Sequence, residues 1–226
     1  MAELDQDTIT RAYARWAPIY DLVFGSVFDR GRKASIAAAE CIGGRILDVG
    51  LGTGISLADY SRSNHIVGVD YSEPMLRKAR ARVAAHGLTH VETLAVMDAQ
   101  RLGFPNASFD VVVAQFVITA VPDPEATLDE FARVTKPGGE IILVNHLSAE
   151  AGLRWSFDQW FAPVARRLGW RTEFRWARLE QWAERHGGVR VVERRAIPPL
   201  GHFSLIRFER MAVSASRQQT AAAGSR

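Results

Sequence analysis

The run Asp48-Val49-Gly50-Leu51-Gly52-Thr53-Gly54 decides the fold, because it joins a short apolar stretch, residues 45–49, to a segment with helical character. Glycines in such a connection allow a tight turn and let the backbone approach a ligand closely. Their spacing is G-x-G-x-G, whereas loops that bind a dinucleotide pyrophosphate have the spacing G-x-G-x-x-G. Asp48 would oppose a pyrophosphate and favour a cationic group. The run therefore predicts a ligand with a positively charged amino-acid end, the alternative being a turn without a ligand.

Strands and helices alternate around this loop over the first 145 residues. Apolar stretches predict strands at 45–49, 66–69, 91–96, 109–114, 141–144, 189–195 and 203–208, and helices from 57, over 74–86 and over 123–135. Pro137-Gly138-Gly139 is expected to stop the last of these helices. The pattern predicts a doubly wound α/β sheet covered on both faces, with ligands bound beyond the carboxyl ends of its strands.

Length and composition indicate one domain at 1–210, with a tail at 211–226 that is expected to be disordered. The net charge of +3 implies no strong polyanion partner, and the single cysteine excludes an intramolecular disulfide. No apolar run reaches the ~20 residues of a membrane-spanning helix, and the N-terminus lacks the layout of a secretory signal. We therefore expect a cytoplasmic protein without a transmembrane segment, and no metal site.

Acidic residues stand at the ends of the second and third predicted strands as well as the first. Asp70 can bond both hydroxyls of a ribose. Asp98 can accept from an adenine amino group, and Met75 would cover the adenine ring. Each acid alone is more often a cap or a turn residue. Acids at the ends of three consecutive strands, however, predict a nucleoside site.

The ordered motifs resemble those of class I S-adenosylmethionine-dependent methyltransferases. They are D-V-G-L-G-T-G at 48–54, V-D-Y-S-E-P-M-L at 69–76, M-D-A at 97–99 and K-P-G-G-E at 136–140. The resemblance covers about residues 10–145 and implies a Rossmann-like, seven-stranded, mostly parallel sheet of order 3-2-1-4-5-7-6, with strand seven antiparallel. It also implies that S-adenosylmethionine is the cofactor, with its methionine end on the glycine loop. The cofactor-binding residues that it implies are Tyr13, Asp48, Gly50, Gly52, Gly54, Asp70, Tyr71, Met75, Asp98, Ala99, Gln115 and Phe116.

The segment Tyr13-Ala14-Arg15-Trp16-Ala17-Pro18-Ile19-Tyr20-Asp21 is similar to a signature of one branch of that family. The branch includes quinone-biosynthesis methyltransferases and bacterial phosphatidylethanolamine N-methyltransferases. The resemblance implies that residues 1–40 form a helical lid over the cofactor. Tyr13 and Tyr20 would line the site, where their rings can stabilise a cation. Trp16 is expected to pack the helix onto the sheet.

An aromatic and basic insertion after strand five, residues 147–180, bears on the acceptor. Five of the six tryptophans lie within 28 residues, between arginines. Such a composition suits a membrane interface. It also suits a cap over a small-molecule pocket, whereas single-stranded nucleic acid is disfavoured by the modest net charge. Arg175, Arg178 and Arg195 are candidates for binding a lipid phosphate, with no basis for choosing among them.

The whole chain, including Val144-Asn145-His146-Leu147-Ser148, resembles the Rhodobacter-like bacterial phosphatidylethanolamine N-methyltransferases. The resemblance implies stepwise methylation of phosphatidylethanolamine to phosphatidylcholine by a peripheral enzyme at the inner, anionic face of the membrane. Tyr20 and His146 are the catalytic candidates, to orient the amine or to take its proton, although a histidine there is more often structural. The alternatives are a quinone or other small-molecule C- or O-methyltransferase, and a module that binds the cofactor without catalysis.

Overall fold

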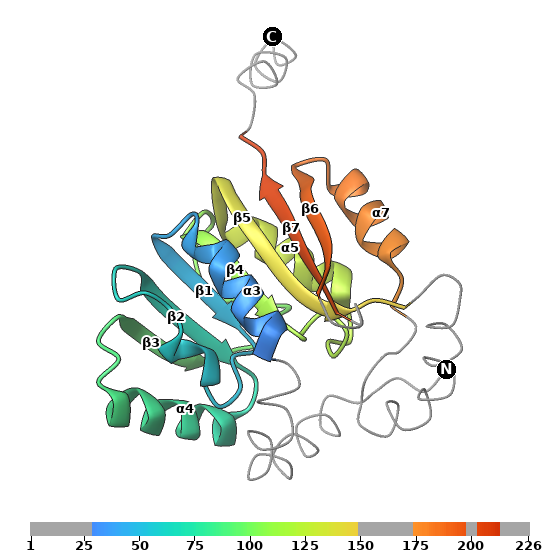
Figure 1. Ribbon diagram of the computed structural model, residues 1–226. Coiled ribbons are helices and arrows are strands. Elements are labelled where there is room, and N and C mark those ends of the chain that lie inside the picture. Colours follow the sequence, from blue (N-terminus) through green and yellow to red (C-terminus); the bar gives the residue numbers. More distant parts are fainter. Residues whose placement is uncertain (1–28, 149–173, 198–202, 213–226) are drawn as a thin grey trace.

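The computed structural model describes residues 29–148, 174–197 and 203–212, which build a single seven-stranded sheet with helices on both faces (Figure 1). The strands run in the order β3-β2-β1-β4-β5-β7-β6. β7 is antiparallel to both of its neighbours, and the other pairs are parallel. The strands are β1 (Arg45–Val49), β2 (His65–Asp70), β3 (Val91–Val96), β4 (Phe109–Gln115), β5 (Thr135–His146), β6 (Val189–Ile197) and β7 (Phe203–Arg210). The predicted fold class and strand order are confirmed.

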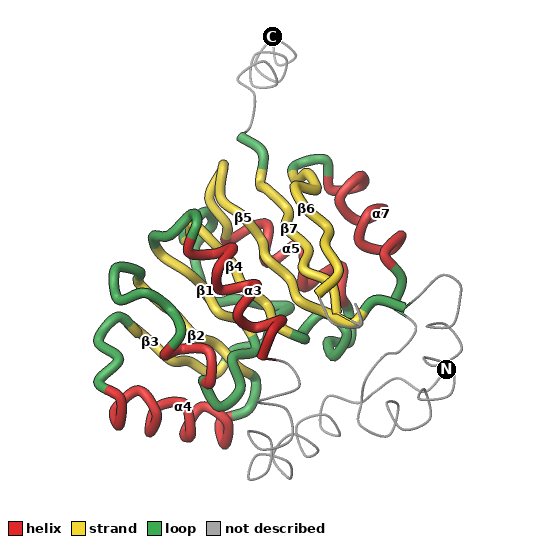
Figure 2. Tube along the Cα trace, viewed as in Figure 1, coloured by secondary structure: helices red, strands yellow, loops and turns green. Residues whose placement is uncertain are grey.

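The helices divide between the two faces of this sheet (Figure 2). α3 (Asp29–Glu40), α4 (Glu73–His86) and the short 3-10 helix η1 (Ile55–Ala58) contribute to one apolar core. α5 (Pro124–Val134) and α7 (Trp176–His186) contribute to the other. β4 serves both, because Val111 and Val113 point into the first core while Val112 and Ala114 point into the second. A strand segment buried on both faces has to be apolar, which is why residues 111–114 show no polar alternation.

The prediction that Pro137-Gly138-Gly139 stops the preceding helix is wrong, because the helix ends before these residues. α5 ends at Val134 and β5 begins at once with Thr135, so the glycines lie inside the strand. Gly138 has φ +80°, and a Cβ on Gly139 would lie 2.4 Å from the carbonyl oxygen of Asp110. The register of β4 against β5 shifts at this point. The two glycines therefore allow an irregular strand to pass close to its neighbour.

The helix predicted from residue 57 is also wrong in extent. Only η1 forms after the glycine loop, with i→i+3 bonds such as that from the Asp59 amide to the carbonyl of Ser56. Tyr60 turns its side chain inward, where its hydroxyl bonds Asp48. This polar contact takes the place of a further helical turn.

One edge of the sheet collects the carboxyl ends of the parallel strands. Val49 lies opposite Val69 on one side and opposite Ala114 on the other. At the end of β5, His146 lies opposite Phe203, the first residue of the antiparallel β7. The loops that carry the predicted site residues therefore meet along this edge.

Candidate functional site

The glycine loop after β1 has the conformation that its sequence predicts. Gly50, Gly52 and Gly54 have φ of 69°, 58° and 73°, a region that other residues rarely adopt. A Cβ on Gly50 would lie 2.4 Å from Cγ2 of Val117, so only glycine fits there. At Gly52 a Cβ would meet no atom of the described residues within 4 Å. The loop thus turns its backbone toward open space, as a ligand-binding loop must.

Asp48 lies beneath this loop as a buried carboxylate without a basic partner among the described residues. It is 1% exposed and accepts hydrogen bonds from Ser56 Oγ at 3.0 Å and from Tyr60 Oη at 3.2 Å. Burial raises the pKa of Asp48 to about 7, the two hydroxyl donors oppose that rise, and the negative charge of Asp70 adds to it. A cationic group at this position would favour the ionised form. Sequence reasoning missed Ser56 and Tyr60, because they act only through a turn that it did not predict.

Asp70 connects the glycine loop to the end of β2. Its Oδ2 accepts from the Gly52 amide at 2.8 Å and its Oδ1 accepts from the Ser72 amide at 2.8 Å. Burial is the main cause that raises the pKa of Asp70, and the two amide bonds oppose it. Each oxygen keeps a second lone pair, which can accept from a ribose hydroxyl. Ser72 Oγ is buried there without a hydrogen-bond partner.

The remaining predicted residues of this half lie along the same edge. The amide of Met97 donates to the carbonyl of Asp70 at 3.1 Å, so the loop with Asp98 and Ala99 adjoins the loop of Asp70. Asp98 Oδ1 accepts from the Gln100 amide at 2.9 Å. Tyr71 is 45% exposed, whereas Met75, in the first turn of α4, is 1% exposed.

Aromatic side chains mark the other half of the edge. Phe116, directly after β4, has φ 64°, and its amide donates to the carbonyl of Val144 at 2.7 Å. Its ring meets that of Phe203 edge to face, with centroids 5.1 Å apart. The ring of His146 lies 6.3 Å from that of Phe203. Phe203 was missed by sequence reasoning, since only the antiparallel pairing of β7 brings it to this edge.

Gln115 belongs to the same region and is held in place from α3. Its Nε2 donates to Ser35 Oγ at 3.0 Å. The structure therefore brings Gln115, Phe116 and His146 to the ends of β4 and β5, as their sequence positions predicted. Tyr13 and Tyr20 lie outside the described residues, as does all of the predicted lid before residue 29.

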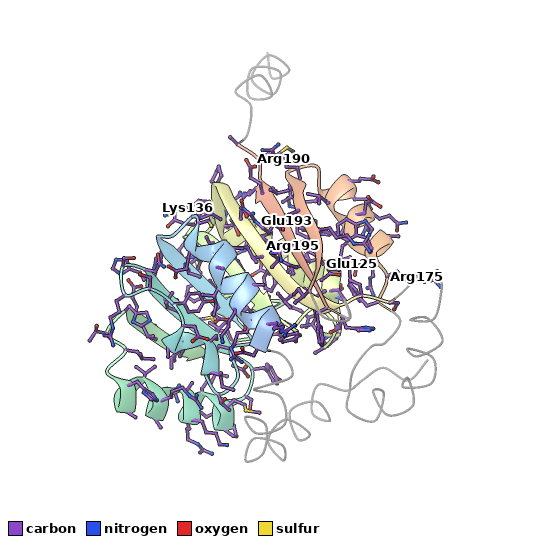
Figure 3. All side chains as sticks on the ribbon, in the orientation of Figure 1. Glu125, Lys136, Arg175, Arg190, Glu193 and Arg195 are labelled. Carbon is purple, nitrogen blue, oxygen red and sulfur yellow. The ribbon has the colours of Figure 1, made fainter. Side chains whose placement is uncertain are left out.

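The three arginines proposed for phosphate binding have different surroundings, and Figure 3 labels Arg175 and Arg195 among them. Arg178 makes a bidentate pair with Glu125, both bonds being 2.6 Å long. This pair lowers the pKa of Glu125 and raises that of Arg178. Arg195 Nε donates to Glu193 at 2.8 Å. Arg175, at the start of α7, is exposed and has no hydrogen-bonding side-chain partner among the described residues.

Two tryptophans of the predicted aromatic and basic region are described, and both are on α7. Trp182 is 2% exposed and donates from Nε1 to Asp129 at 2.8 Å, so it packs α7 onto α5. Trp176 is half-buried, with the guanidinium of Arg194 4.7 Å from its ring centroid. The other three, at 155, 160 and 170, lie outside the described residues.

These groups fit S-adenosylmethionine by their chemistry. The cofactor carries a cationic amino-acid end, a ribose and an adenine. The buried carboxylate of Asp48 suits the first, and the glycine loop leaves room beside it. The lone pairs of Asp70 and the unpartnered hydroxyl of Ser72 suit a ribose, and Asp98 follows on the next strand. Within the described segments, no three His, Cys, Asp or Glu side chains are grouped to hold a metal ion.

Comparison with known proteins agrees with this chemistry. Residues 47–143 match the methyltransferase domain family. The chain is 39% identical to a phosphatidylethanolamine N-methyltransferase of Cereibacter sphaeroides over 207 residues, which are 92% of this chain and 100% of that protein. It is 40% identical to a demethylmenaquinone methyltransferase of Clavibacter sepedonicus, but over 57% of this chain and 52% of that protein.

Solved structures share the fold at lower identity. A methyltransferase of Thermotoga maritima that depends on S-adenosylmethionine has a TM-score of 0.65 and 23% identity, over 89% of this chain and 99% of its own. The cyclase SpnF has a TM-score of 0.74 and 18% identity, over 92% of this chain and 97% of its own. Because a cyclase shares this fold, the structural likeness alone does not establish methyl transfer. The sequence relationship over 92% of the chain establishes it: the chain belongs to the class I S-adenosylmethionine-dependent methyltransferases and is an enzyme that uses S-adenosylmethionine as methyl donor.

Proposed function

We propose that this enzyme is a peripheral phospholipid N-methyltransferase that converts phosphatidylethanolamine stepwise to its methylated derivatives and phosphatidylcholine. The supporting observation is the relationship to the Cereibacter sphaeroides enzyme, which extends over 92% of the chain. This sequence relationship therefore includes α7, β6 and β7, which lie outside residues 47–143, the part that matches the methyltransferase domain family. The relationship to the Clavibacter sepedonicus quinone enzyme spans about half of that protein.

Bound S-adenosylmethionine supplies a methyl group on a sulfonium, and the carbon–sulfur electron pair stays on sulfur when the methyl group moves to the acceptor nitrogen. The residues of this chain then have to position a neutral amine. An alkyl ammonium has a pKa of roughly 10, so deprotonating it at pH 7 costs about 4 kcal/mol. We propose that His146, at the end of β5, orients the amine or takes its proton, together with Tyr20.

For the lipid phosphate we favour Arg175 among the three predicted arginines. Arg178 and Arg195 already pair with carboxylates, which a phosphate would have to displace. Arg175 is exposed at the start of α7, and Trp176 follows it. No helix among the described residues is long and apolar enough to span a bilayer. The proposed contact is therefore with the anionic surface on the inner side of the membrane, through basic and aromatic side chains.

The proposal is tested by incubating the enzyme with methyl-labelled S-adenosylmethionine and vesicles that contain phosphatidylethanolamine and an anionic lipid, followed by lipid chromatography. Label is expected in the mono-, di- and trimethylated lipids, and the rate should fall as salt rises because charged contacts are screened. A parallel reaction contains a quinone precursor instead. Label in the quinone and none in the phospholipid would overturn the proposal. Cofactor binding without transfer to any acceptor would indicate a binding module.

A further inference from the structure

The aromatic wall, which we define as Phe116, His146 and Phe203, lies at the carboxyl edge where β4 and β5 end and β7 begins. The register pairs His146 with Phe203 and Phe203 with Ile197, so Phe203 occupies the edge itself. The Phe203 ring lies at 77° to the Phe116 ring and at 81° to the His146 ring. Two approximately perpendicular contacts on one side chain fix the orientation of its ring.

The backbone at Phe116 is strained, and packing maintains the strain. A bulky residue with φ 64° is a backbone outlier, which persists only where its surroundings hold it. Its amide is bonded to Val144, and its ring presses on α3, where a Cβ on Gly31 would lie 3.3 Å from Phe116 Cζ. The glycine in α3 thus makes room for this ring. Strain held by its surroundings in this way is typical of positions with a functional role.

Exposure separates the aromatic wall from the core beneath it. Phe116, His146 and Phe203 are all half-buried, whereas Val144 and Leu205, within two residues along the strands, are fully buried. The three rings therefore form the outer end of the core at the edge where Gln115 and the glycine loop also lie. An acceptor amine bound at the end of β4, as the proposed function requires, would lie beside these rings.

Stepwise methylation changes what such a surface has to recognise. Each transfer forms one nitrogen–carbon bond, leaves the carbon–sulfur electron pair on sulfur and releases one proton, so the ammonium has one fewer N–H after every step and none after the last. Hydrogen-bond acceptors consequently lose their hold on the nitrogen as the reaction proceeds. Aromatic rings keep their attraction to the nitrogen, because their π-electrons attract the distributed charge of a methylated ammonium.

We propose that Phe203 is a specificity-determining residue, which together with Phe116 and His146 retains the acceptor nitrogen during the second and third methylations. The inference rests on the proposed function, because it assumes an amine that is methylated repeatedly. Phe203→Leu keeps an apolar side chain but removes the ring. The later transfers should therefore suffer more than the first.

The test measures kcat/KM separately for phosphatidylethanolamine and for its monomethyl and dimethyl derivatives. In Phe203→Leu the ratio of dimethyl to unmethylated substrate should fall about 3- to 10-fold, so that partly methylated lipid accumulates. Phe203→Tyr, which keeps the ring, should retain the wild-type ratio. Phe208→Leu is the matched control on the same strand, since Phe208 is fully buried against Trp182. It should lower Tm and leave the ratio unchanged.

An unchanged ratio in Phe203→Leu would overturn the inference while leaving the proposed function intact. If the wild-type enzyme methylates no phospholipid, the proposed function fails. The role of the aromatic wall is then tested separately, by measuring the binding of headgroup analogues. Calorimetry then compares phosphocholine with phosphoethanolamine. If Phe203→Leu binds phosphocholine more weakly and phosphoethanolamine as well as the wild type does, the result supports recognition of the methylated ammonium by the aromatic wall. Equal loss for both ligands, or no loss, contradicts it.

Discussion

Two pairs of carboxylates, one at the glycine loop and one in the distant half of the molecule, are held in opposite ways. Around β1 and β2, Asp48 and Asp70 are bound by hydroxyl and amide donors, no basic residue of the described chain pairs with them, and burial raises the pKa of each. On the other side, Glu125 and Glu193 pair with arginines, which lower their pKa values. Buried carboxylates without a cation keep the capacity to bind a cationic ligand, whereas paired carboxylates stabilise the structure.

The largest expected effect that tests this comparison comes from Asp48→Asn. The amide still accepts from Ser56 and Tyr60 but offers no charge to a cationic amino-acid end. We expect the Kd of S-adenosylhomocysteine to rise about 100-fold, the size of a lost contact between buried charges. Wild-type affinity should fall as pH drops below about 7, where Asp48 takes up a proton. Calorimetric titrations of both proteins between pH 6 and 8 measure this.

Stability should change in the opposite direction to affinity. Because the folded pKa of Asp48 is raised, the native state holds a proton that the unfolded chain releases, so stability without cofactor falls as pH rises from about 4 to about 7. The full difference is on the order of 4 kcal/mol at most. Asp48→Asn should flatten this decline, while Asp70, whose pKa is also raised, keeps its own contribution in the same direction. Denaturant unfolding at pH 5 and pH 8 would contradict the comparison if the two proteins showed parallel pH dependence.

A smaller effect is expected from filling the space beside the glycine loop. Gly52 and Gly87 have nearly equal φ, 58° and 55°, and within the described part of the chain a Cβ at either position would meet no atom within 4 Å. Gly87, however, caps α4 and is not in the cofactor loop. Alanine at either position should cost about 1 kcal/mol of stability for the left-handed backbone. Only Gly52→Ala should also weaken S-adenosylhomocysteine, by about 10-fold, because its methyl group occupies ligand space.

Thermal unfolding and calorimetry on both glycine variants provide the measurement. Equal loss of affinity in Gly52→Ala and Gly87→Ala would mean that backbone strain, and not ligand space, governs binding. In that case the open volume over the loop would have no role in recognising the cofactor.

The cofactor half of the site could be predicted from the sequence to a greater extent than the acceptor half. The cofactor half is encoded locally, since Asp48, Asp70 and Asp98 each lie at or just beyond the end of a strand and the loop geometry depends on adjacent glycines. Short patterns of this kind indicate chemistry directly. Even there, Tyr60 was missed, because its contact with Asp48 depends on a helix ending early.

The acceptor half depends on contacts distant in sequence. Phe203 reaches Phe116 only because β7 runs antiparallel beside β5, and Arg178 pairs with Glu125 across 53 residues. Spacing in the chain does not report such neighbours. An arginine can be recognised as basic in the sequence, but only packing shows whether a carboxylate already holds it. For that reason the predicted phosphate arginines could not be ranked before the structure.

The smallest expected effects separate Arg178 from Arg175. Arg178→Ala removes a bidentate pair between α7 and α5 and should cost about 1 kcal/mol, seen as a Tm lower by about 2–4 °C. Folding lowers the pKa of Glu125, so the pair contributes its full stability at pH values above the pKa that Glu125 has in the unfolded chain. The contribution disappears as pH falls through the pKa that Glu125 has in the native state. Glu125→Gln should give a similar loss of Tm, and the double variant should lose no more than either single variant.

Arg175→Ala should leave Tm unchanged and instead raise KM for phosphatidylethanolamine vesicles about 3-fold at low salt. A Tm loss in Arg175→Ala without a change in KM would reverse these roles and reject Arg175 as the phosphate-binding residue.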